Sequence, residues 1–196
     1  MQTARINYAG AMIELPSETI VKNWLASLQE QPAVSASRAG VPFIGGYWPG
    51  QGGIYAGVIR SDDGAPDRHV IVPTASESKI APSPWGEYGT AIPDCESNLN
   101  GHANTAAMVE FGNELALKVA ALRIEGHSDF YLPARHELRL CYLNVPELLD
   151  KEWYWSSTQY SALSAFYQDF GGGYQGNGGK SYKLRARAVR SIQVSN

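Results

Sequence analysis

The chain has 196 residues, of which 44% are hydrophobic and 18% are charged, and its formal net charge is −3. These values indicate an ordered globular protein of one domain, or of one domain with a short appendage. The small negative charge excludes a global field that would recruit nucleic acid or an anionic membrane. No apolar run is long enough to span a bilayer, and residues 1–8 lack the apolar core of a signal peptide. We therefore expect synthesis in a cytoplasm.

Two cysteines, Cys95 and Cys141, lie far apart in the sequence and in no spacing typical of a metal site. We expect reduced thiols, at least one of them buried, and no disulfide scaffold.

The first predicted element is an N-terminal helix that Ser17 can cap. Its apolar residues recur at helical spacing: Ile20, Val21, Trp24, Leu25 and Leu28. Residues 32–41 are small and without period, which is typical of a linker. The sequence therefore predicts that residues 1–41 form an attachment or oligomerisation segment with its linker, and that residues 42–196 form the globular domain. A helix packed on its own domain is an equally ordinary interpretation of the first part.

A β-hairpin is predicted at the start of the globular part. Residues 53–60 and 68–73 have the composition of strands, and the polar residues 62–67 between them are typical of a turn. Residues 74–103 are polar and contain several Pro and Gly residues, so they predict a long ordered loop.

Two helices follow the predicted loop. The first covers residues 104–122 and begins at Asn104 or Thr105, either of which can cap it. Its apolar positions are Met108, Phe111, Leu115, Val119 and Leu122. The second covers residues 135–144, with Leu138, Cys141 and Tyr142 facing inward.

The last part of the chain, residues 153–192, predicts a small antiparallel sheet of three β-type segments separated by turns, one of them the glycine-rich residues 171–179. We assign to core and cross-strand packing its aromatic residues Trp153, Tyr154, Trp155, Phe166, Tyr167 and Phe170. The last segment alternates Tyr182, Leu184, Ala186 and Ala188 with basic residues. We expect one solvated basic face, made by Lys180, Lys183, Arg185, Arg187 and Arg190.

The tripeptide from Gly179 to Ser181 invites comparison with a phosphate-binding loop, which needs a first glycine five residues earlier and opens a helix. That earlier position is Tyr174, and the residues after Ser181 have the period of a strand. The sequence therefore excludes the nucleotide-binding motif.

Oxygen-bearing side chains alternate before Gly101, as in calcium loops: Asp94, Glu96, Asn98 and Asn100. Counted from Glu96, the twelfth position is Ala107 and not the bidentate glutamate of an EF-hand, which excludes that loop type. A looser calcium site built on Asp94, Glu96 and Asn98 is a weak alternative to a polar loop that caps the next helix.

The sequence carries no catalytic signature. His69, His102, His127 and His136 share no ligand spacing, and His69 is expected to pack within its strand. His127 and Asp129 could form a polar pair, although a turn hydrogen bond explains them equally well. No nucleophile motif of known hydrolases occurs.

Recognition is a second interpretation of the aromatic content. Tyr160 and Tyr174 lie in turn-like stretches beside small polar residues, a composition that gives contact area at low entropic cost. Plain loops have the same composition. The candidate ligand-binding residues are Tyr160, Tyr174, Gln175 and Asn177.

Five stretches together resemble a bacterial and phage domain family of unknown function, related to the C-terminal domain of collagen-like adhesins. They are residues 46–53 (GYWPGQGG), 101–108 (GHANTAAM), 130–138 (FYLPARHEL), 153–158 (WYWSST) and 185–190 (RARAVR). The family has a C-type-lectin-like fold, similar to the variable domains of retroelement-diversified phage tropism proteins and to formylglycine-generating enzyme. The resemblance implies an α+β domain over residues 42–192, with two helices on a twisted antiparallel sheet and long loops on one side, to which the N-terminal helix is added.

Two departures from these relatives bear on function. The Glu-Pro-Asn, Gln-Pro-Asp and Trp-Asn-Asp triplets of calcium-dependent sugar binders are absent. Cys95 and Cys141 do not match the cysteine pair of formylglycine-generating enzyme, since Cys141 falls on the apolar side of a helix. The expectation is therefore a protein that is not an enzyme and needs no cofactor, calcium being the weak alternative.

The resemblance implies a phage or prophage virion protein, tail- or capsid-associated, that displays a lectin-like domain for binding a host-surface glycan or protein. Its N-terminal segment would bind other virion proteins, and the chain would form a homo-oligomer such as a trimer. The alternative is a structural decoration or baseplate protein that binds only virion proteins. A third hypothesis, an enzyme or a metal-dependent lectin, ranks lowest.

Overall fold

The computed structural model describes residues 3–8, 11–16, 40–61 and 64–194. The chain divides into two units, Met1–Gly40 and Val41–Asn196, and each is described by itself. In the first unit, β1 (Thr3–Tyr8) and β2 (Ala11–Pro16) form an antiparallel hairpin that the sequence did not predict. The predicted helix that begins at Ser17 lies outside the described residues.

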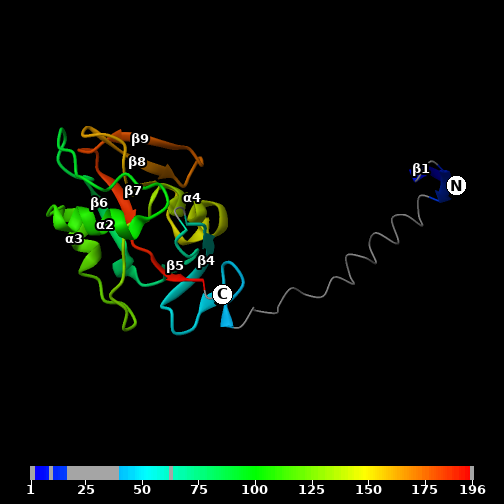
Figure 1. Cartoon of the computed structure of the whole chain (residues 1–196), viewed down its shortest axis with the longest axis horizontal. Helices are drawn as coiled ribbons and strands as arrows, with labels where there is room; N and C mark the ends of the chain where they lie inside the picture. Colours follow the sequence, from blue (N-terminus) through cyan, green and yellow to red (C-terminus); the bar gives the residue numbers. More distant parts are fainter. Residues whose placement is uncertain (1–2, 9–10, 17–39, 62–63, 195–196) are drawn as a thin grey trace. The chain divides into compact units, whose positions relative to one another are not determined.

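The second unit contains three helices and two sheets within the described residues, so the predicted α+β class is confirmed. The helices are α2 (Gly101–Glu110), α3 (Glu114–Ala120) and α4 (Arg135–Asn144), with 3₁₀ turns η2 (Ser76–Ser78) and η3 (Pro146–Leu148). The strands are β3 (Tyr47–Trp48), β4 (Gly53–Ile59), β5 (Arg68–Pro73), β6 (Lys79–Ser83), β7 (Trp153–Gln159), β8 (Ser164–Asp169), β9 (Gln175–Gly179), β10 (Leu184–Arg187) and β11 (Arg190–Gln193). One sheet has the order β6-β10-β7-β8-β9 and the other the order β11-β5-β4-β3 (Figure 1).

The predicted hairpin is confirmed as β4 and β5, which pair antiparallel. Every residue of β5 after Arg68 is buried. The strand lies between β4 and β11, and its side chains pack on both faces of the sheet, Val70 and Val72 in the core that contains α4 and Ile71 against Trp48. The prediction of a single sheet is wrong, because the strands of this unit form two sheets. The prediction that all strands run antiparallel is also wrong, since β10 runs parallel to β7 through Arg185 and Tyr154.

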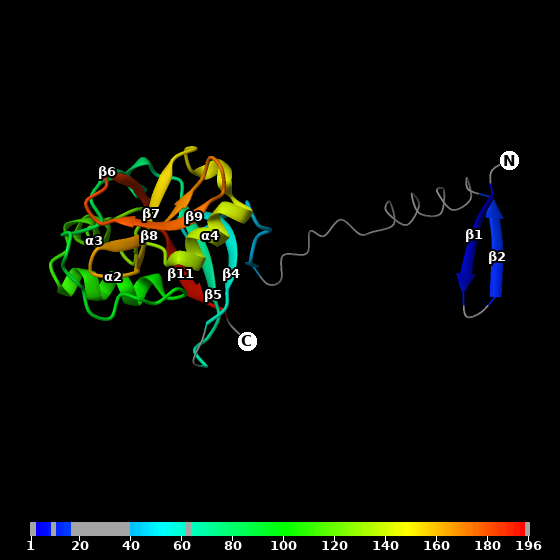
Figure 2. The ribbon, with the colours of Figure 1, turned by 90° about the horizontal axis from the view of Figure 1, so that it is seen from above.

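The five-stranded sheet separates two cores, because successive side chains of β7 point to opposite faces. Trp155 packs in one core with Met108 of α2 and Leu115 of α3. Tyr154 packs in the other with Leu138 of α4. Helix α4 therefore lies between the two sheets and contacts β4, β7 and β8, as the view in Figure 2 shows.

The predicted helix over residues 104–122 is two helices. Gly112 has a left-handed φ of +83° and ends α2, and the side chain of Asn113 accepts a hydrogen bond from the Ala116 amide (3.0 Å) to cap α3. The cap of α2 is Asn100 rather than the predicted Asn104 or Thr105, both of which are buried inside the helix. Helix α4 has the predicted limits.

Two strands lie where the sequence predicted loop or turn. Strand β6 lies within the predicted long loop, and β9 lies within the glycine-rich segment. Glycine and proline lower the propensity of both segments for strand, so their strand form depends on pairing with β10 and β8.

The predicted solvated basic face is wrong for three of its five residues: Lys180, Arg187 and Arg190 are buried. The guanidinium of Arg190 donates to Asp129 (2.9 Å) and to Gln51 (2.7 Å), and Nη2 of Arg187 donates to the Pro73 carbonyl. Buried charges of this kind require such partners.

Candidate functional site

Strand β9 is the edge of the five-stranded sheet and carries glycines at three of its five positions. A Cβ atom on Gly176 would lie 2.7 Å from the Tyr174 ring. A Cβ atom on Gly178 would lie 3.1 Å from the Tyr167 ring and 3.2 Å from the Tyr182 ring. The missing side chains therefore leave the space that these aromatic rings occupy.

We define the aromatic cluster as Trp153, Tyr167, Tyr174 and Tyr182. The ring centroids of Trp153 and Tyr167 are 4.7 Å apart, and those of Tyr167 and Tyr174 are 6.2 Å apart. Tyr167 is buried at the centre, while Trp153 is 43% exposed and Tyr174 and Tyr182 are each 60% exposed. The cluster thus presents three exposed aromatic rings around one buried ring.

The hydroxyl groups of the cluster lie close enough to affect one another. Burial raises the pKa of Tyr167, and Tyr174, Tyr182 and Asp169 raise it further. The Tyr167 phenol is therefore neutral near pH 7, and a phenol hydroxyl can both donate and accept a hydrogen bond. Asp169 is occupied in holding the turn before Tyr174, since its carboxylate accepts from the Gly171 and Gly172 amides (2.7 and 3.0 Å).

The other face of the same edge carries a second, smaller aromatic group. The rings of Tyr160 and Phe166 meet edge to face at 5.3 Å, and the Arg135 guanidinium lies 4.2 Å from the Phe166 centroid. Gln175 exchanges two hydrogen bonds with Arg135: its Oε1 accepts from Nε (3.0 Å), and its Nε2 donates to the carbonyl (2.9 Å).

The four candidate residues from the sequence therefore do not form one site. Tyr174 belongs to the aromatic cluster. Gln175 and Asn177 alternate with the glycines along β9, so their side chains point to the opposite face. They pair with Gln168 and Phe166 respectively, and Tyr160 lies on this face against Phe166. Tyr160 and Tyr174 are equally exposed, at 60% each. Gln175 is engaged by Arg135, which leaves Tyr160 and Asn177 as the exposed groups of that face.

Sequence reasoning missed three members of the aromatic cluster. Trp153 and Tyr167 were assigned to core and cross-strand packing, which is confirmed for the buried Tyr167. Tyr182 was placed in a strand, although it lies in the turn before β10. The one sequence feature that points to the cluster is the pair of glycines at alternate positions, Gly176 and Gly178. These glycines indicate room for aromatic rings only once their pairing with Tyr167 and Ala165 is known.

The weak calcium candidates are largely occupied by protein donors or face solvent. Asp94 is exposed in a left-handed conformation (φ 57°), and Oε1 of Glu96 accepts from the Gln159 side chain (2.9 Å). Asn98 is exposed and Asn100 caps α2. Within the described residues, no three His, Cys, Asp or Glu side chains gather as a metal ion would require.

Both thiols are buried, and His69 and His127 contact other groups of the protein. Cys95 and Cys141 are both free and buried, and burial raises the pKa of each thiol to about 12. His69 packs, as expected, against Trp48 and is 3.0 Å from the Tyr55 hydroxyl. Asp129 pairs with Arg190, while Nε2 of His127 lies 3.0 Å from the Gly50 carbonyl oxygen.

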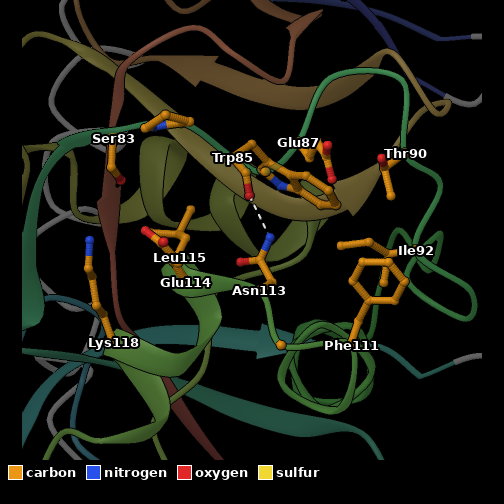
Figure 3. A pocket seen from close by; sticks show the side chains of 13 residues that line it. Ser83, Trp85, Glu87, Thr90, Ile92, Phe111, Asn113, Glu114, Leu115 and Lys118 are labelled. Carbon is orange, nitrogen blue, oxygen red and sulfur yellow. Dashed lines mark hydrogen bonds between the residues drawn. The ribbon is translucent and has the colours of Figure 1, made fainter.

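A pocket of about 490 Å³ opens at the elbow between α2 and α3 (Figure 3). Asn113 stands at its centre and donates to the Trp85 carbonyl (2.8 Å), which ties the elbow to the loop that follows β6. Ser83 and Lys118 lie toward one end in Figure 3, and Phe111 and Ile92 lie toward the other.

Comparison of the sequence with protein-family models and with curated proteins finds no match. Among the helices of the described segments, none is long and apolar enough to cross a membrane.

Proposed function

We propose that the unit Val41–Asn196 is a C-type-lectin-like recognition domain of a phage or prophage virion protein, and that its aromatic cluster binds a glycan on the host surface. The observation that carries the binding proposal is the exposure of Trp153, Tyr174 and Tyr182 on one glycine-backed face. The virion context and the lectin-like classification rest on the five stretches that resemble the phage domain family.

The chemistry of the cluster suits a sugar ring. Exposed aromatic faces pack against the apolar C–H face of a pyranose, and the phenol hydroxyls of Tyr174 and Tyr182 can exchange hydrogen bonds with its hydroxyl groups. A tyrosine also provides contact area with few rotatable bonds, so little entropy is lost on binding. Because Tyr167 packs beneath the exposed rings, part of the surface is already ordered.

The fold supports the lectin-like proposal in its coarse features. Helices pack on both faces of the β7–β8 sheet, and the loop of residues 84–100 connects β6 to α2. The proposed binding requires no metal, in keeping with the absence from the sequence of the triplets that chelate calcium in sugar-binding relatives.

The unit Met1–Gly40 is proposed to attach the chain to other virion proteins, and the protein is proposed to act as a homo-oligomer, such as a trimer. Single sugar contacts are weak, and several copies on one particle raise the effective affinity by orders of magnitude when they engage together.

The decisive experiment compares the two faces of the β9 edge on a glycan array and on host cells. The double variant Tyr174→Ala/Tyr182→Ala should reduce binding at least about tenfold, as expected for aromatic hot-spot residues. Tyr160→Ala, on the opposite face, and Tyr88→Ala, whose side chain is 58% exposed, are matched controls and should bind like the parent.

A loss confined to Tyr160→Ala would overturn the assignment to the cluster. Binding of the intact oligomer to virion proteins alone, with no glycan or host cell bound, would favour the structural decoration or baseplate alternative.

A further inference from the structure

The pocket at the α2–α3 elbow is preformed. Its central Asn113 is fixed at both ends of its amide, because Oδ1 accepts from Ala116 (3.0 Å) and Nδ2 donates to Trp85 (2.8 Å). Trp85 is fully buried, and its indole N–H donates to the Ser156 carbonyl (2.8 Å). Trp85 therefore supports the wall, and a ligand would meet other groups.

The groups free to meet a ligand combine one apolar surface with charges. Phe111 is half exposed at one end of the pocket. The Ser83 hydroxyl, toward the other end, is buried without a hydrogen-bond partner among the described residues and is not accessible to a ligand. Glu87, Glu114 and Lys118 complete the polar lining, with two carboxylates against one ammonium.

This composition selects the class of ligand. The volume lies within the range of small-molecule sites. A ring that packs on Phe111 while its hydroxyls reach the carboxylates of Glu87 and Glu114 contacts both kinds of surface. The excess of negative charge disfavours an acidic sugar and favours a neutral or amino sugar.

The pocket and the aromatic cluster lie on two sides of one turn, residues 180–184. At the start of this turn the Lys180 carbonyl accepts from the Trp85 amide (2.9 Å), and at its end Leu184 pairs with Ser83. Between these two points Tyr182 packs over Gly178. The turn thus connects a pocket wall directly to the aromatic cluster.

We propose that the pocket is a second subsite for the same glycan, and that it takes a neutral or amino-bearing pyranose residue and not a uronic acid. The inference rests on the proposed glycan-binding function and extends it by naming the charge class of the sugar and a second contact region.

The test uses the indole N–H signals of the full ¹⁵N-labelled chain, which contains five tryptophans. Trp153 reports on the aromatic cluster. Trp85 reports on the pocket. Trp155 reports on both regions, because its indole N–H donates to the Ser83 carbonyl (3.1 Å) and its ring lies 6.2 Å from that of Tyr167. Single Trp→Phe substitutions assign the signals.

The probes are neutral sugar, 2-amino sugar and uronic acid of the gluco, galacto and manno series, each added at millimolar concentration. We expect at least one neutral or amino sugar to shift the Trp85 and Trp155 signals, and the uronic acid of that series to bind at least about threefold more weakly because of the pocket charge. Phe111→Ala should weaken the binding at least about fivefold. Leu117→Ala, which truncates an exposed apolar residue on α3 outside the pocket, should not.

Glu114→Gln should reduce the discrimination against the uronic acid, whereas Glu110→Gln, outside the pocket, should leave it unchanged. The inference is overturned if no sugar moves the Trp85 signal, if the uronic acid binds as tightly as its neutral partner, or if Phe111→Ala has no effect. Movement of Trp153 without Trp85 would support the proposed function while overturning the pocket subsite. Movement of Trp85 without Trp153 would support a sugar site in the pocket and count against the aromatic cluster.

Discussion

The ammonium of Lys180 lies 4.6 Å from the centroid of the Trp85 ring, inside the protein. It donates to the Thr90 carbonyl and to Oε1 of Gln159, both at 2.6 Å, and burial lowers its pKa. This lysine belongs to the tripeptide that resembles part of a phosphate-binding loop, and it holds three loop and strand segments together instead of facing a ligand.

Lys180→Met keeps most of the unbranched apolar stem and removes the ammonium with its donors, so the Thr90 carbonyl loses its partner. We expect a loss of about 1–3 kcal/mol in the free energy of unfolding. Lys183→Met, at an exposed position, should change stability by less than about 0.5 kcal/mol. Urea denaturation monitored by circular dichroism measures both, and equal midpoints for the two variants would contradict the structural role of Lys180.

The carboxylate of Glu137 joins three segments at the start of α4. It is fully buried and accepts from the Gly101 amide (3.1 Å), the Ala134 amide (2.8 Å) and the Tyr131 hydroxyl (2.9 Å), with Nη2 of Arg68 at 3.3 Å. The first turn of α4 and the first turn of α2 are therefore held together by the side chain of Glu137.

Glu137→Gln replaces one carboxylate oxygen by an NH₂ group, which would then face other hydrogen-bond donors. The substitution also leaves Arg68 without its charged partner. We expect a cost of about 3–5 kcal/mol, typical of breaking a buried charge pair. Glu110→Gln, exposed at the end of α2, is the matched control and should be near neutral. Thermal and urea unfolding test the difference, and a Glu137→Gln protein as stable as the control would show that the network is dispensable.

Sequence patterns predicted those elements whose signal is local. Strands β4 and β5 have turn residues between two apolar runs, and α4 has a short apolar stripe of helical period. The break between α2 and α3 escaped prediction because the apolar period continues through Phe111 and Leu115 across Gly112. There the conformation of one glycine and the cap by Asn113 override the pattern.

The candidate site depends on partners distant in the sequence, which explains why prediction failed there. Gly178 forms part of a strand because it pairs with Ala165. It is a glycine at a position where the Tyr182 ring leaves little room for a side chain. Arg190 is buried because Asp129, 61 residues away, accepts from it. A single sequence shows neither relationship, so glycine content indicated a turn and positive charge indicated a solvated face.

Acid should destabilise the protein in part through His69. Burial lowers the pKa of His69 below its ordinary value of 6.5, and burial together with Arg135 lowers that of His136. At pH values between the lowered pKa of the folded state and 6.5, the unfolded chain binds more protons than the folded chain. The stability present above pH 6.5 is therefore lost as the pH falls to the pKa of the folded state.

We expect the urea midpoint to decrease when the pH is lowered from about 7.5 to about 5.5. The decrease should be smaller in His69→Phe, because phenylalanine cannot bind a proton. His102→Gln, at an exposed position, serves as the control and should keep the full dependence. An unchanged pH dependence in His69→Phe would assign the acid sensitivity to other groups.

Gly178→Val tests whether the glycine strand exists to accommodate the aromatic cluster. The new side chain would meet the rings of Tyr167 and Tyr182, and only the exposed Tyr182 ring has room to move. We expect a destabilisation of about 1–3 kcal/mol from overpacking, together with a loss of glycan binding, because the displaced Tyr182 ring is one of the proposed contacts. Asn177→Val, the neighbouring residue on the opposite face of β9, should keep both stability and binding, because valine favours strand and meets no ring of the cluster. Thermal unfolding and the glycan array read out the two effects separately. If Gly178→Val loses stability and still binds like the parent, the glycines serve packing alone and the ligand contacts lie elsewhere.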